Sequence, residues 1–313
     1  MREDTPSRTA AWVAAARHLG RLLPEATRLA DDPYGAAFTS PLLARLIEQA
    51  IEGSSPASLP TALRSIRHPL TKLPGLRAWI LYMQVRTRVI DDALRAFVEA
   101  GGRQLLVLGA GYDCRALRLP ELHDVRVFEV DHPATQGHKR AVLDQLGVDS
   151  PAHYVTWDFE ARPMEDLPEA LVEFGHDAST PTFTIWEGVT MYLSEPAINA
   201  SLRAIAEWSA PGSELAMTYF AKSHLAKPSL AQRAIQAVVA TVGEPWRWGW
   251  VPEELPAYLH ERGLELVRDV SLASAARELL PPELAAYVSD HDRRVALAAA
   301  PESIALGRRT LPT

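Results

Sequence analysis

The chain has 313 residues, of which 47% are apolar and 23% are charged, and its formal net charge is −7 at pH 7. This composition is typical of a soluble globular protein with a sizeable core, and it excludes a chain that is disordered throughout. A mildly acidic chain lacks the basic surface that replaces phosphate counterions in general nucleic-acid binding. We therefore expect no nucleic-acid partner.

The single cysteine, Cys114, excludes an internal disulfide and cysteine-rich metal sites, and no other cluster has metal-ligand spacing, so we expect no metal. There is no uninterrupted apolar run of about 18 residues, which predicts no membrane span. The start of the chain carries acids and its apolar stretch, 10–16, is short, so we expect no secretory signal. Together these features predict a cytoplasmic protein without a membrane partner, and they leave the oligomeric state open.

Helical spacing of apolar residues dominates the first hundred residues, with helices predicted over 10–23, 41–51 and 76–100. The second helix is expected to place Leu42, Leu43, Leu46 and Ile47 on one face. Residues 53–75 are rich in proline and glycine and are predicted to form a surface loop. We assign residues 1–75 to an N-terminal helical lid and residues 76–313 to the core.

From residue 104 the pattern changes to short apolar runs that alternate with helical segments. Strands are predicted at 104–108, 125–131, 153–157, 182–186, 214–220, 264–271 and 303–308, with helices at 134–146, 195–209 and 253–262. This alternation predicts an α/β fold, with a doubly wound and mostly parallel sheet. Residues 222–252 and 275–299 are expected to be helical insertions in that core.

A glycine turn follows the first predicted strand. Gly109 and Gly111 allow positive φ and a close approach of a ligand to the backbone. Asp131 ends the second predicted strand 20 residues after Gly111, where an acid can accept hydrogen bonds from ribose hydroxyls. The pair predicts a nucleoside-type cofactor site, although the glycines alone would also fit a simple tight turn.

The residues around the turn favour S-adenosyl-L-methionine as the cofactor. A dinucleotide motif prefers a third small residue, and here that position is Cys114, followed by the large Arg115. Asp113 would repel a pyrophosphate, whereas it suits a cofactor with a cationic amino-acid tail. Two alternatives stay open: an NAD(P)-dependent oxidoreductase, and a non-catalytic cofactor-binding regulator of the same fold.

Three segments together resemble one known family: 86–91 (RTRVID), 108–115 (LGAGYDCR) and 128–133 (FEVDHP). They look like the signatures of the leucine carboxyl methyltransferase-like family of class I S-adenosylmethionine-dependent methyltransferases, in its bacterial small-molecule branch. Segments 157–159 (WDF) and 187–193 (EGVTMYL) match as well. The resemblance covers about residues 76–220 and implies a Rossmann-like core that transfers a methyl group.

The resemblance also implies roles for individual residues around the glycine turn. Arg86 would pair with the methionine carboxylate of the cofactor, because a guanidinium fork fits a carboxylate. Gly109 and Gly111 would line the methionine moiety, and Asp131 would hold the ribose. The alternative for Arg86 is a solvated position on a helix face.

Three further residues are assigned by the same resemblance. Asp158 and Phe159 would meet the adenine, and Glu187 would lie near the cofactor's ammonium and the methyl-transfer centre. Asp158 could instead cap the segment that follows it.

The acceptor is expected to be an oxygen, either a carboxylate or a hydroxyl, of a small metabolite such as a secondary metabolite. A carboxylate is ionised at pH 7 and needs no general base, whereas a hydroxyl usually does. His132, His224, Tyr192 and Tyr219 are candidate bases that the sequence does not rank, so no catalytic residue is assigned.

Aromatic residues suggest where the acceptor would lie. Trp246, Trp248 and Trp250 alternate and would share one face of an extended segment, either gripping a flat acceptor or packing in the core. The residues expected to face the substrate are Tyr192, Tyr219, His224 and Trp248.

Overall fold

The computed structural model describes residues 6–53, 74–159, 161–226 and 246–301. Its centre is a seven-stranded sheet in the order β3-β2-β1-β4-β5-β7-β6. The strands are β1 (Gln104–Leu108), β2 (Arg126–Asp131), β3 (His153–Thr156), β4 (Thr182–Trp186), β5 (Glu214–Phe220), β6 (Glu265–Ser271) and β7 (Arg293–Ala299). The first five are parallel, and β7 runs antiparallel to both β5 and β6. The predicted doubly wound, mostly parallel α/β sheet is confirmed.

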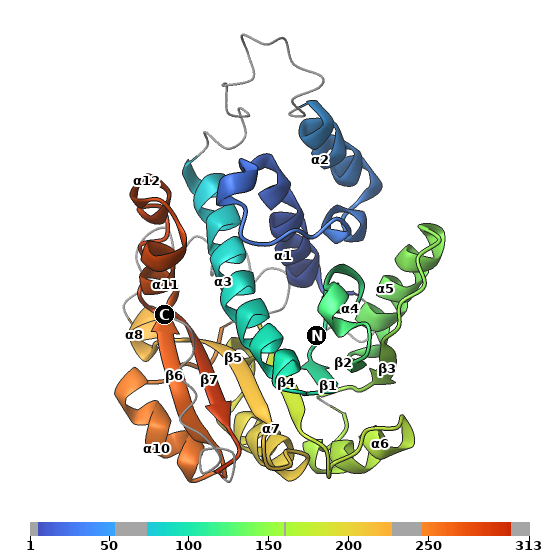
Figure 1. Ribbon diagram of the computed structural model, residues 1–313, viewed down its shortest axis with the longest axis vertical. Coiled ribbons are helices and arrows are strands. Elements are labelled where there is room, and N and C mark those ends of the chain that lie inside the picture. The colour runs from blue at the N-terminus through green and yellow to red at the C-terminus, as the bar shows by residue number, and fades with distance from the viewer. Residues whose placement is uncertain (1–5, 54–73, 160, 227–245, 302–313) are drawn as a thin grey trace.

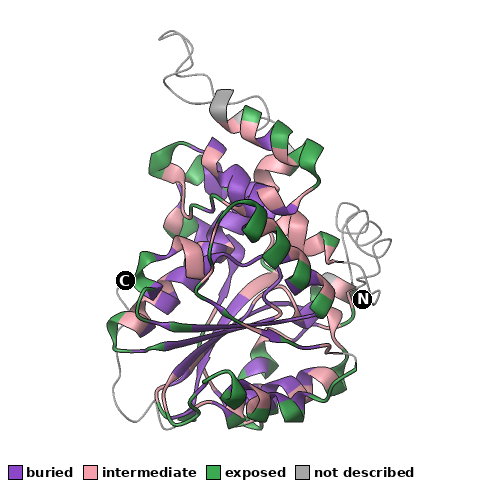
Figure 2. Ribbon diagram, turned by 90° about the vertical axis from the view of Figure 1, so that its right-hand side faces the viewer, coloured by how far each residue is buried: buried purple, intermediate pink, exposed green. Residues whose placement is uncertain are grey.

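Two helical layers cover the sheet (Figures 1 and 2). One layer contains α1 (Arg8–Leu19), α3 (Pro74–Glu99), α11 (Leu272–Leu279) and α12 (Pro282–Ala285), whose apolar side chains form one buried cluster with the sheet. The other contains α6 (Leu167–Glu173), α7 (Glu195–Glu207) and α10 (Leu255–His260), which pack on the opposite face. Because both faces are covered, β1 and β4 are buried along their whole length. In β4 the hydroxyls of Thr182 and Thr184 accept hydrogen bonds from the side chains of Gln104 and Trp208.

The remaining helices are α2 (Pro41–Gly53), α4 (Arg115–Arg118), α5 (Pro133–Gln145) and α8 (Lys222–Ala226). None of the described helices combines the length and the apolar character needed to cross a bilayer. Helix α2 forms where the sequence predicts it, but only Ile47 of its apolar face is buried; Leu42, Leu43 and Leu46 are exposed.

Strand order positions the candidate site. The chain moves from β1 outward to β2 and β3, and then crosses back to place β4 on the other side of β1. At such a switch point the loops beyond the two neighbouring strands diverge and leave a crevice at the carboxyl ends. The glycine turn after β1, Asp131 at the end of β2 and Glu187 after β4 all lie at this edge.

The C-terminal part of the core differs from the prediction. Residues 275–299 were expected to be a helical insertion, but after α11 and α12 the chain forms β7 from Arg293 to Ala299. The sequence of this segment, RRVALAA, is short and rich in alanine, and β7 is covered on both faces, so it shows no strand alternation. The predicted strand at 303–308, most of the predicted insertion at 222–252 and most of the predicted loop at 53–75 lie outside the described residues.

Candidate functional site

The turn after β1 depends on its glycines. Gly109 has φ +72° and Gly111 has φ +52°, conformations that residues with a side chain rarely adopt. A Cβ atom on Gly109 would lie 2.4 Å from Val189 Cγ2, and one on Gly111 would lie 3.1 Å from Ala10 Cβ. The turn is therefore enclosed between the segment that follows β4 and the N-terminal helix α1, with its backbone facing the crevice.

Replacing Gly109 by alanine is expected to lower the free energy of unfolding by about 1–3 kcal/mol, because alanine must take a positive φ and displace Val189. Gly137→Ala is the matched control, since Gly137 lies on the exposed side of α5 with open space around its Cα. It should raise the free energy of unfolding by about 0.5–1 kcal/mol through better helix propensity. Urea unfolding of both variants measures this, and equal effects would contradict the role of the turn.

Asp131 faces this turn from the end of β2. Its Oδ2 accepts a hydrogen bond from the backbone N–H of Gly111, and its Oδ1 accepts one from the N–H of His132 at 2.6 Å. Burial raises the pKa of the Asp131 carboxyl above its ordinary value, and the two backbone donors only partly offset that rise. The structure thus brings together the two features that the sequence predicts 20 residues apart.

Glu187 leaves the end of β4 between two guanidinium groups. Arg86 Nε of helix α3 lies 2.7 Å from Glu187 Oε1, and Arg115 Nη2 lies 2.9 Å from Glu187 Oε2. Burial by itself would raise the pKa of the Glu187 carboxyl, but Arg86, Arg115 and Arg17 outweigh it and hold the pKa far below its ordinary range. Glu187 is therefore ionised at any physiological pH, and Arg86 is not a solvated surface residue.

The Arg86–Glu187 pair belongs to a larger buried network. Arg115 also contacts Asp113 and lies 2.7 Å from Asp91, and Arg118 pairs with Asp91 at 2.7 Å. Three acids are thus matched by the three arginines 86, 115 and 118. A buried network of this kind is tolerated because every charge has an opposite partner.

This network changes the interpretation of Asp113. From the sequence we expect its carboxylate to favour a cationic ligand. In the structure this carboxylate already contacts the guanidinium of Arg115, and its Oδ1 accepts a hydrogen bond from the backbone N–H of Arg115 at 2.7 Å. Burial is outweighed by Arg115 and Arg17, which lower the pKa of the Asp113 carboxyl. The acid that reaches the crevice beside Arg86 is Glu187, a placement that depends on how α3 crosses the sheet.

The segment after β3 forms the next wall of the crevice. The backbone N–H of Trp157 donates to the carbonyl of Asp131 at 2.8 Å, which ties this segment to the end of β2. Asp158 Oδ2 lies 3.7 Å from His132 Nε2, and Asp158 Oδ1 accepts from the N–H of Ala161 at 3.3 Å. Asp158 thus caps its own turn next to the Asp131 site, and Phe159 is partly buried against the α6–α7 side of the core.

The four residues expected to face the substrate are found in different surroundings. Tyr192 lies in the short helix η8 (Thr190–Tyr192) that follows Glu187, and it is partly exposed. Tyr219 is buried in the sheet, where its hydroxyl donates to Asp269 Oδ2 at 2.8 Å. The side chain of His224 lies outside the described part of the chain, although its backbone belongs to α8.

The alternating tryptophans pack mainly in the core. Trp248 lies edge-on to Trp250, with ring centroids 5.9 Å apart, and it also contacts Tyr258 of α10. The Trp246 ring lies 4.7 Å from that of Phe220, at the end of β5. The core-packing alternative therefore describes the surroundings of Trp248 and Trp250.

His132 is the N-cap residue of helix α5. Its Nδ1 accepts a hydrogen bond from the N–H of Ala134 at 3.2 Å and so caps the start of α5.

Tyr219→Phe is expected to lower the free energy of unfolding by about 1.5–3 kcal/mol, because it removes a buried hydrogen bond to a carboxylate. Tyr258→Phe, which loses a hydrogen bond to the neutral Asn199, should cost about 0.5–1.5 kcal/mol. Neither change should alter ligand affinity at the crevice, and both can be measured by thermal unfolding and calorimetry. A loss of turnover in Tyr219→Phe with unchanged stability would instead identify Tyr219 as a base.

N-terminal elements lie directly over the glycine turn. Arg17 Nη2 of α1 donates to the carbonyl of Tyr112 at 2.6 Å, and its Nε pairs with Asp32 at 2.9 Å. Phe38, in the short helix η3 (Gly35–Phe38), stacks on Tyr112 with ring centroids 4.5 Å apart. These contacts place α1 and η3 against the glycine turn.

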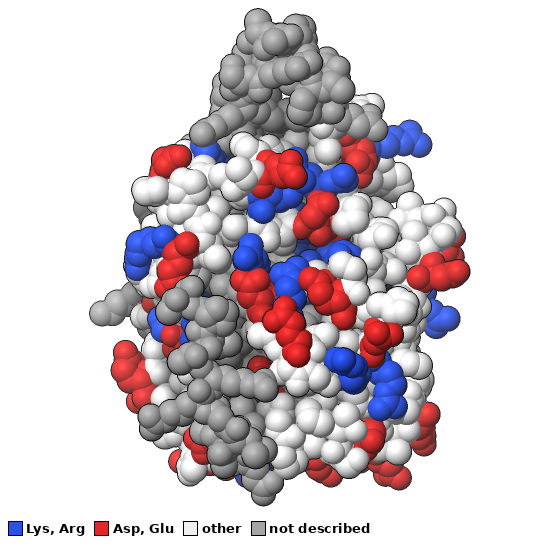
Figure 3. All heavy atoms as spheres, in the orientation of Figure 1, with Lys and Arg blue, Asp and Glu red and all other residues white. Residues whose placement is uncertain are grey.

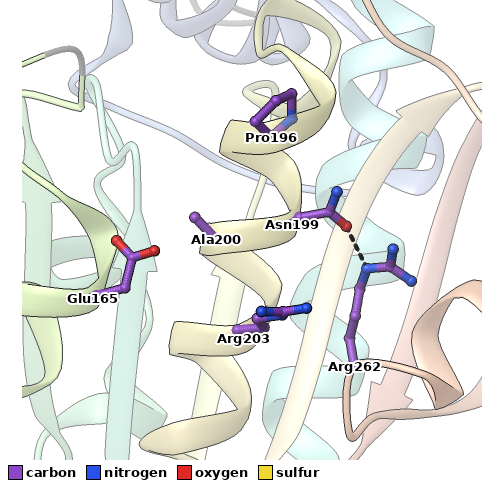
Figure 4. A pocket seen from close by; sticks show the side chains of 6 residues that line it. All are labelled: Glu165, Pro196, Asn199, Ala200, Arg203 and Arg262. Carbon is purple, nitrogen blue, oxygen red and sulfur yellow. Dashed lines mark hydrogen bonds between the residues drawn. The ribbon is translucent and has the colours of Figure 1, made fainter.

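One shallow hollow of about 310 Å³ lies elsewhere, along the outer side of α7 (Figure 4). Arg262 borders it and donates from Nε to Asn199 Oδ1 at 2.6 Å. Its lining residues are Glu165, Pro196, Asn199, Ala200, Arg203 and Arg262. None of them belongs to the glycine turn or to the strand ends, so the hollow is separate from the candidate site.

Neither the surface charge nor the arrangement of metal-ligating side chains indicates a second site in the described part of the chain. On the face drawn in Figure 3, acidic and basic side chains are interspersed. Exposed or half-exposed ion pairs of the described residues include Arg88–Asp92 and Arg95–Glu121. Within the described ranges there is no group of three or more His, Cys, Asp or Glu side chains arranged to hold a metal ion.

Two proteins of known sequence are similar to this chain over part of its length. A protein of Streptomyces coelicolor is 42% identical over 134 residues, which are 43% of this chain and 47% of that protein. A protein of Mycolicibacterium vanbaalenii is 32% identical over 243 residues, which are 76% of this chain and 74% of that protein. Both carry the name "putative S-adenosyl-L-methionine-dependent methyltransferase". The chain matches about half the length of the Streptomyces coelicolor relative.

The crystal structure of a DUF574 family protein from Streptomyces avermitilis superimposes with a TM-score of 0.54 at 19% identity, covering 92% of this chain and 97% of that one. This similarity supports the fold. Residues 10–206, which include the glycine turn, Asp131 and Glu187, match the family model described as leucine carboxyl methyltransferase. Because that match covers more than half of the chain, the protein belongs to the leucine carboxyl methyltransferase family.

Proposed function

We propose that the protein is an S-adenosyl-L-methionine-dependent methyltransferase that transfers a methyl group to an oxygen, either a carboxylate or a hydroxyl, of a small metabolite. The observation that carries the proposal is the Arg86–Glu187 pair, 2.7 Å apart beside the glycine turn. An adjacent cation and anion at this edge of the sheet match the carboxylate and the ammonium of an amino-acid tail.

The residues present fit this cofactor in three places. Arg86 would hold the carboxylate of the amino-acid end with its guanidinium fork, and Glu187 would hold the ammonium. Asp131, already fixed by two backbone donors, keeps further lone pairs that can accept from ribose hydroxyls. Asp158 and Phe159, on the segment hydrogen-bonded to the end of β2, would meet the adenine.

The same residues argue against a nicotinamide dinucleotide. A pyrophosphate needs donors and positive charge at the turn, and small residues after it. Here Asp113, Asp131 and Glu187 lie around the turn, and Arg115 is occupied by Asp91, Asp113 and Glu187.

The bound cofactor supplies an electrophilic methyl group on a sulfonium. The protein's part is to hold that centre beside the acceptor oxygen, to exclude water and to orient the acceptor for in-line attack. Arg86, Glu187 and Asp131 orient the two ends of the cofactor, and α1 and η3 cover the turn on which it lies. A carboxylate acceptor is ionised at neutral pH, so its attack needs no general base in the site.

The proposal makes two statements about the methyl acceptor: the atom that receives the methyl group is an oxygen, and the acceptor is a small molecule. The description of the matching family, leucine carboxyl methyltransferase, refers to a carboxyl oxygen. Of the two alternatives from the sequence, an oxidoreductase does not explain an ionised glutamate beside a buried arginine as directly. A non-catalytic regulator would bind the same cofactor, so only an assay of turnover separates it from an enzyme.

Calorimetry with S-adenosylhomocysteine and a fluorescence titration with NADH test the cofactor, and we expect only the first ligand to bind. Incubation with methyl-labelled cofactor and a metabolite extract tests the reaction, with the label expected in a small-molecule product. Failure of S-adenosylhomocysteine to bind at millimolar concentration would refute the proposal. Binding without any labelled product would identify a non-catalytic regulator instead.

A further inference from the structure

Arg293 occupies an unusual position at the carboxyl edge of the sheet. It begins β7 and lies opposite Phe220, the last residue of β5. Its guanidinium carbon is 4.9 Å from the ring centroid of Tyr82 and 5.7 Å from that of Phe220. The Tyr82 hydroxyl accepts from the backbone N–H of Asp290 at 2.7 Å, which fixes the ring against the segment leading into β7. Arg293 is thus enclosed between α3 and the end of β5.

The guanidinium of Arg293 is stacked but poorly supplied with hydrogen-bond acceptors. Its side chain is only 12% exposed, and in the described part of the chain its Nε is buried without a hydrogen-bond partner. The carboxylate that balances its charge, Asp290 Oδ2, lies 3.4 Å from Nε, which is long for a charge-assisted hydrogen bond. Leaving such a donor unsatisfied costs free energy, so a further acceptor placed at this guanidinium would be stabilising.

Arg293 lies on the side of the sheet that carries the proposed cofactor-binding residues. Tyr82 and Arg86 are four residues apart on α3, so they share a helix face about 6 Å apart along the axis. Arg86 contacts Glu187, while Tyr82 contacts Arg293. One turn of α3 therefore connects the two arginines.

The strands lead to the same placement. The backbone N–H of Gly188, directly after Glu187, donates to Thr218 Oγ1 at 2.8 Å, two residues before Phe220 on β5. From β4 to β7 is two strand spacings, roughly 10 Å. Arg293 and Glu187 thus lie at one edge of the sheet, separated by a distance on the order of 10 Å.

The chemistry of this position suits one class of ligand. An arginine fork pairs with a carboxylate through two parallel hydrogen bonds, and its five donors can serve Asp290 and a second anion at once. Aromatic rings surround it: Tyr82 and Phe220, both mostly buried, lie against the guanidinium, and the Trp246 ring packs on Phe220. A flat or cyclic acid would satisfy both features.

We propose that Arg293 anchors a carboxylate of the methyl acceptor. This inference rests on the proposed methyltransferase function and adds the substrate class: a cyclic or aromatic carboxylic acid that lies along Tyr82 and Phe220. Its reactive oxygen points toward the Glu187 end of the crevice, on the order of 10 Å from the anchored carboxylate. Arg293 touches the acceptor and sets specificity, while Arg86 serves the cofactor.

The test separates acceptors by charge before the reaction. A metabolite extract is divided at neutral pH on an anion exchanger, and each fraction is incubated with methyl-labelled cofactor and the wild-type protein. We expect the label to enter products from the retained, acidic fraction. Arg293→Met keeps much of the packing and should raise the amount of that fraction needed for half-maximal rate by about 10- to 100-fold, with little change in the maximal rate.

Two further variants complete the design. Arg293→Lys keeps the charge without the fork and should restore part of the lost apparent affinity. Arg277→Met changes an exposed arginine of α11 and should match the wild type. In every variant the affinity for S-adenosylhomocysteine, measured by calorimetry, should stay unchanged, which also reports that the protein is folded.

The outcomes separate this inference from the proposed function. Acceptor activity confined to the unretained fraction would overturn the inference alone, as would an Arg293→Met variant with wild-type acceptor dependence. An equal loss of S-adenosylhomocysteine affinity in Arg293→Met and Arg293→Lys would assign a structural role and would overturn it too. If the wild-type protein labels no fraction, the methyltransferase proposal itself fails.

Discussion

Replacing Arg86 by methionine is expected to weaken the binding of S-adenosylhomocysteine by two to three orders of magnitude. The variant removes the guanidinium that would pair with the ligand's carboxylate. Among the residues that the structure describes, it also leaves Arg115 as the one remaining cation in direct contact with Glu187. Removing one partner of a buried charge pair across a binding interface, here the pair that Arg86 would form with the ligand's carboxylate, typically costs about 2–5 kcal/mol of binding free energy. Calorimetry of the wild-type and variant proteins measures the loss directly.

The neighbouring Arg88 supplies the matched control. It lies two residues further along α3 in a half-exposed pair with Asp92 at 2.7 Å, and exposed pairs of this kind contribute little. Arg88→Met should therefore bind S-adenosylhomocysteine as the wild type does. Arg86→Lys should fall between the two, because it keeps the charge but loses the fork. Equal affinity in Arg86→Met and Arg88→Met would remove the main support for the proposed cofactor site.

Asp131→Asn is expected to weaken the binding of S-adenosylhomocysteine by about 10- to 150-fold, because each hydrogen bond to a charged group contributes about 1.5–3 kcal/mol. The amide also replaces one of the two acceptor oxygens by an NH2 donor. That donor would face the backbone N–H of Gly111 or of His132, and one of these two hydrogen bonds would be lost. Asp144→Asn, an exposed position near the end of α5, is the control and should have no effect.

The pH dependence of binding gives an independent check on Asp131. Burial raises the pKa of this carboxyl, so in the free protein it takes up a proton at a higher pH than an ordinary aspartate. The ionised form accepts the ribose hydroxyls, and affinity should therefore fall as the pH drops through this raised pKa. Asp131→Asn should lack that acid limb. Glu187 should not contribute to it, since its pKa is held far below the ordinary range.

Much of the fold and part of the candidate site follow from the sequence because they rest on local patterns. The positive φ angles of the glycine turn require residues without Cβ atoms, and the apolar run at 105–108 marks β1. The spacing from Gly111 to Asp131 spans one strand–helix–strand step, so the contact between them could be expected.

Other features depend on contacts between segments far apart in the chain. Strand β7 has no alternating pattern, because the helices of both layers cover it, so its sequence does not distinguish it from a helix. Packing in three dimensions pairs Asp113 with Arg115. It also buries Trp250 and packs the partly buried Trp248 against the core. The sequence places the charges but not their partners.

The sequence by itself therefore determines the α/β class, the turn after β1 and the acid at the end of β2, since each is written in residues close together in the chain. Only the tertiary structure decides that Arg86 meets Glu187, that three acids and three arginines form one buried network, and that Arg293 lies between Tyr82 and Phe220. These pairings arise where α3 crosses the carboxyl ends of the strands. The angle and position of that crossing are set by the packing of the whole core.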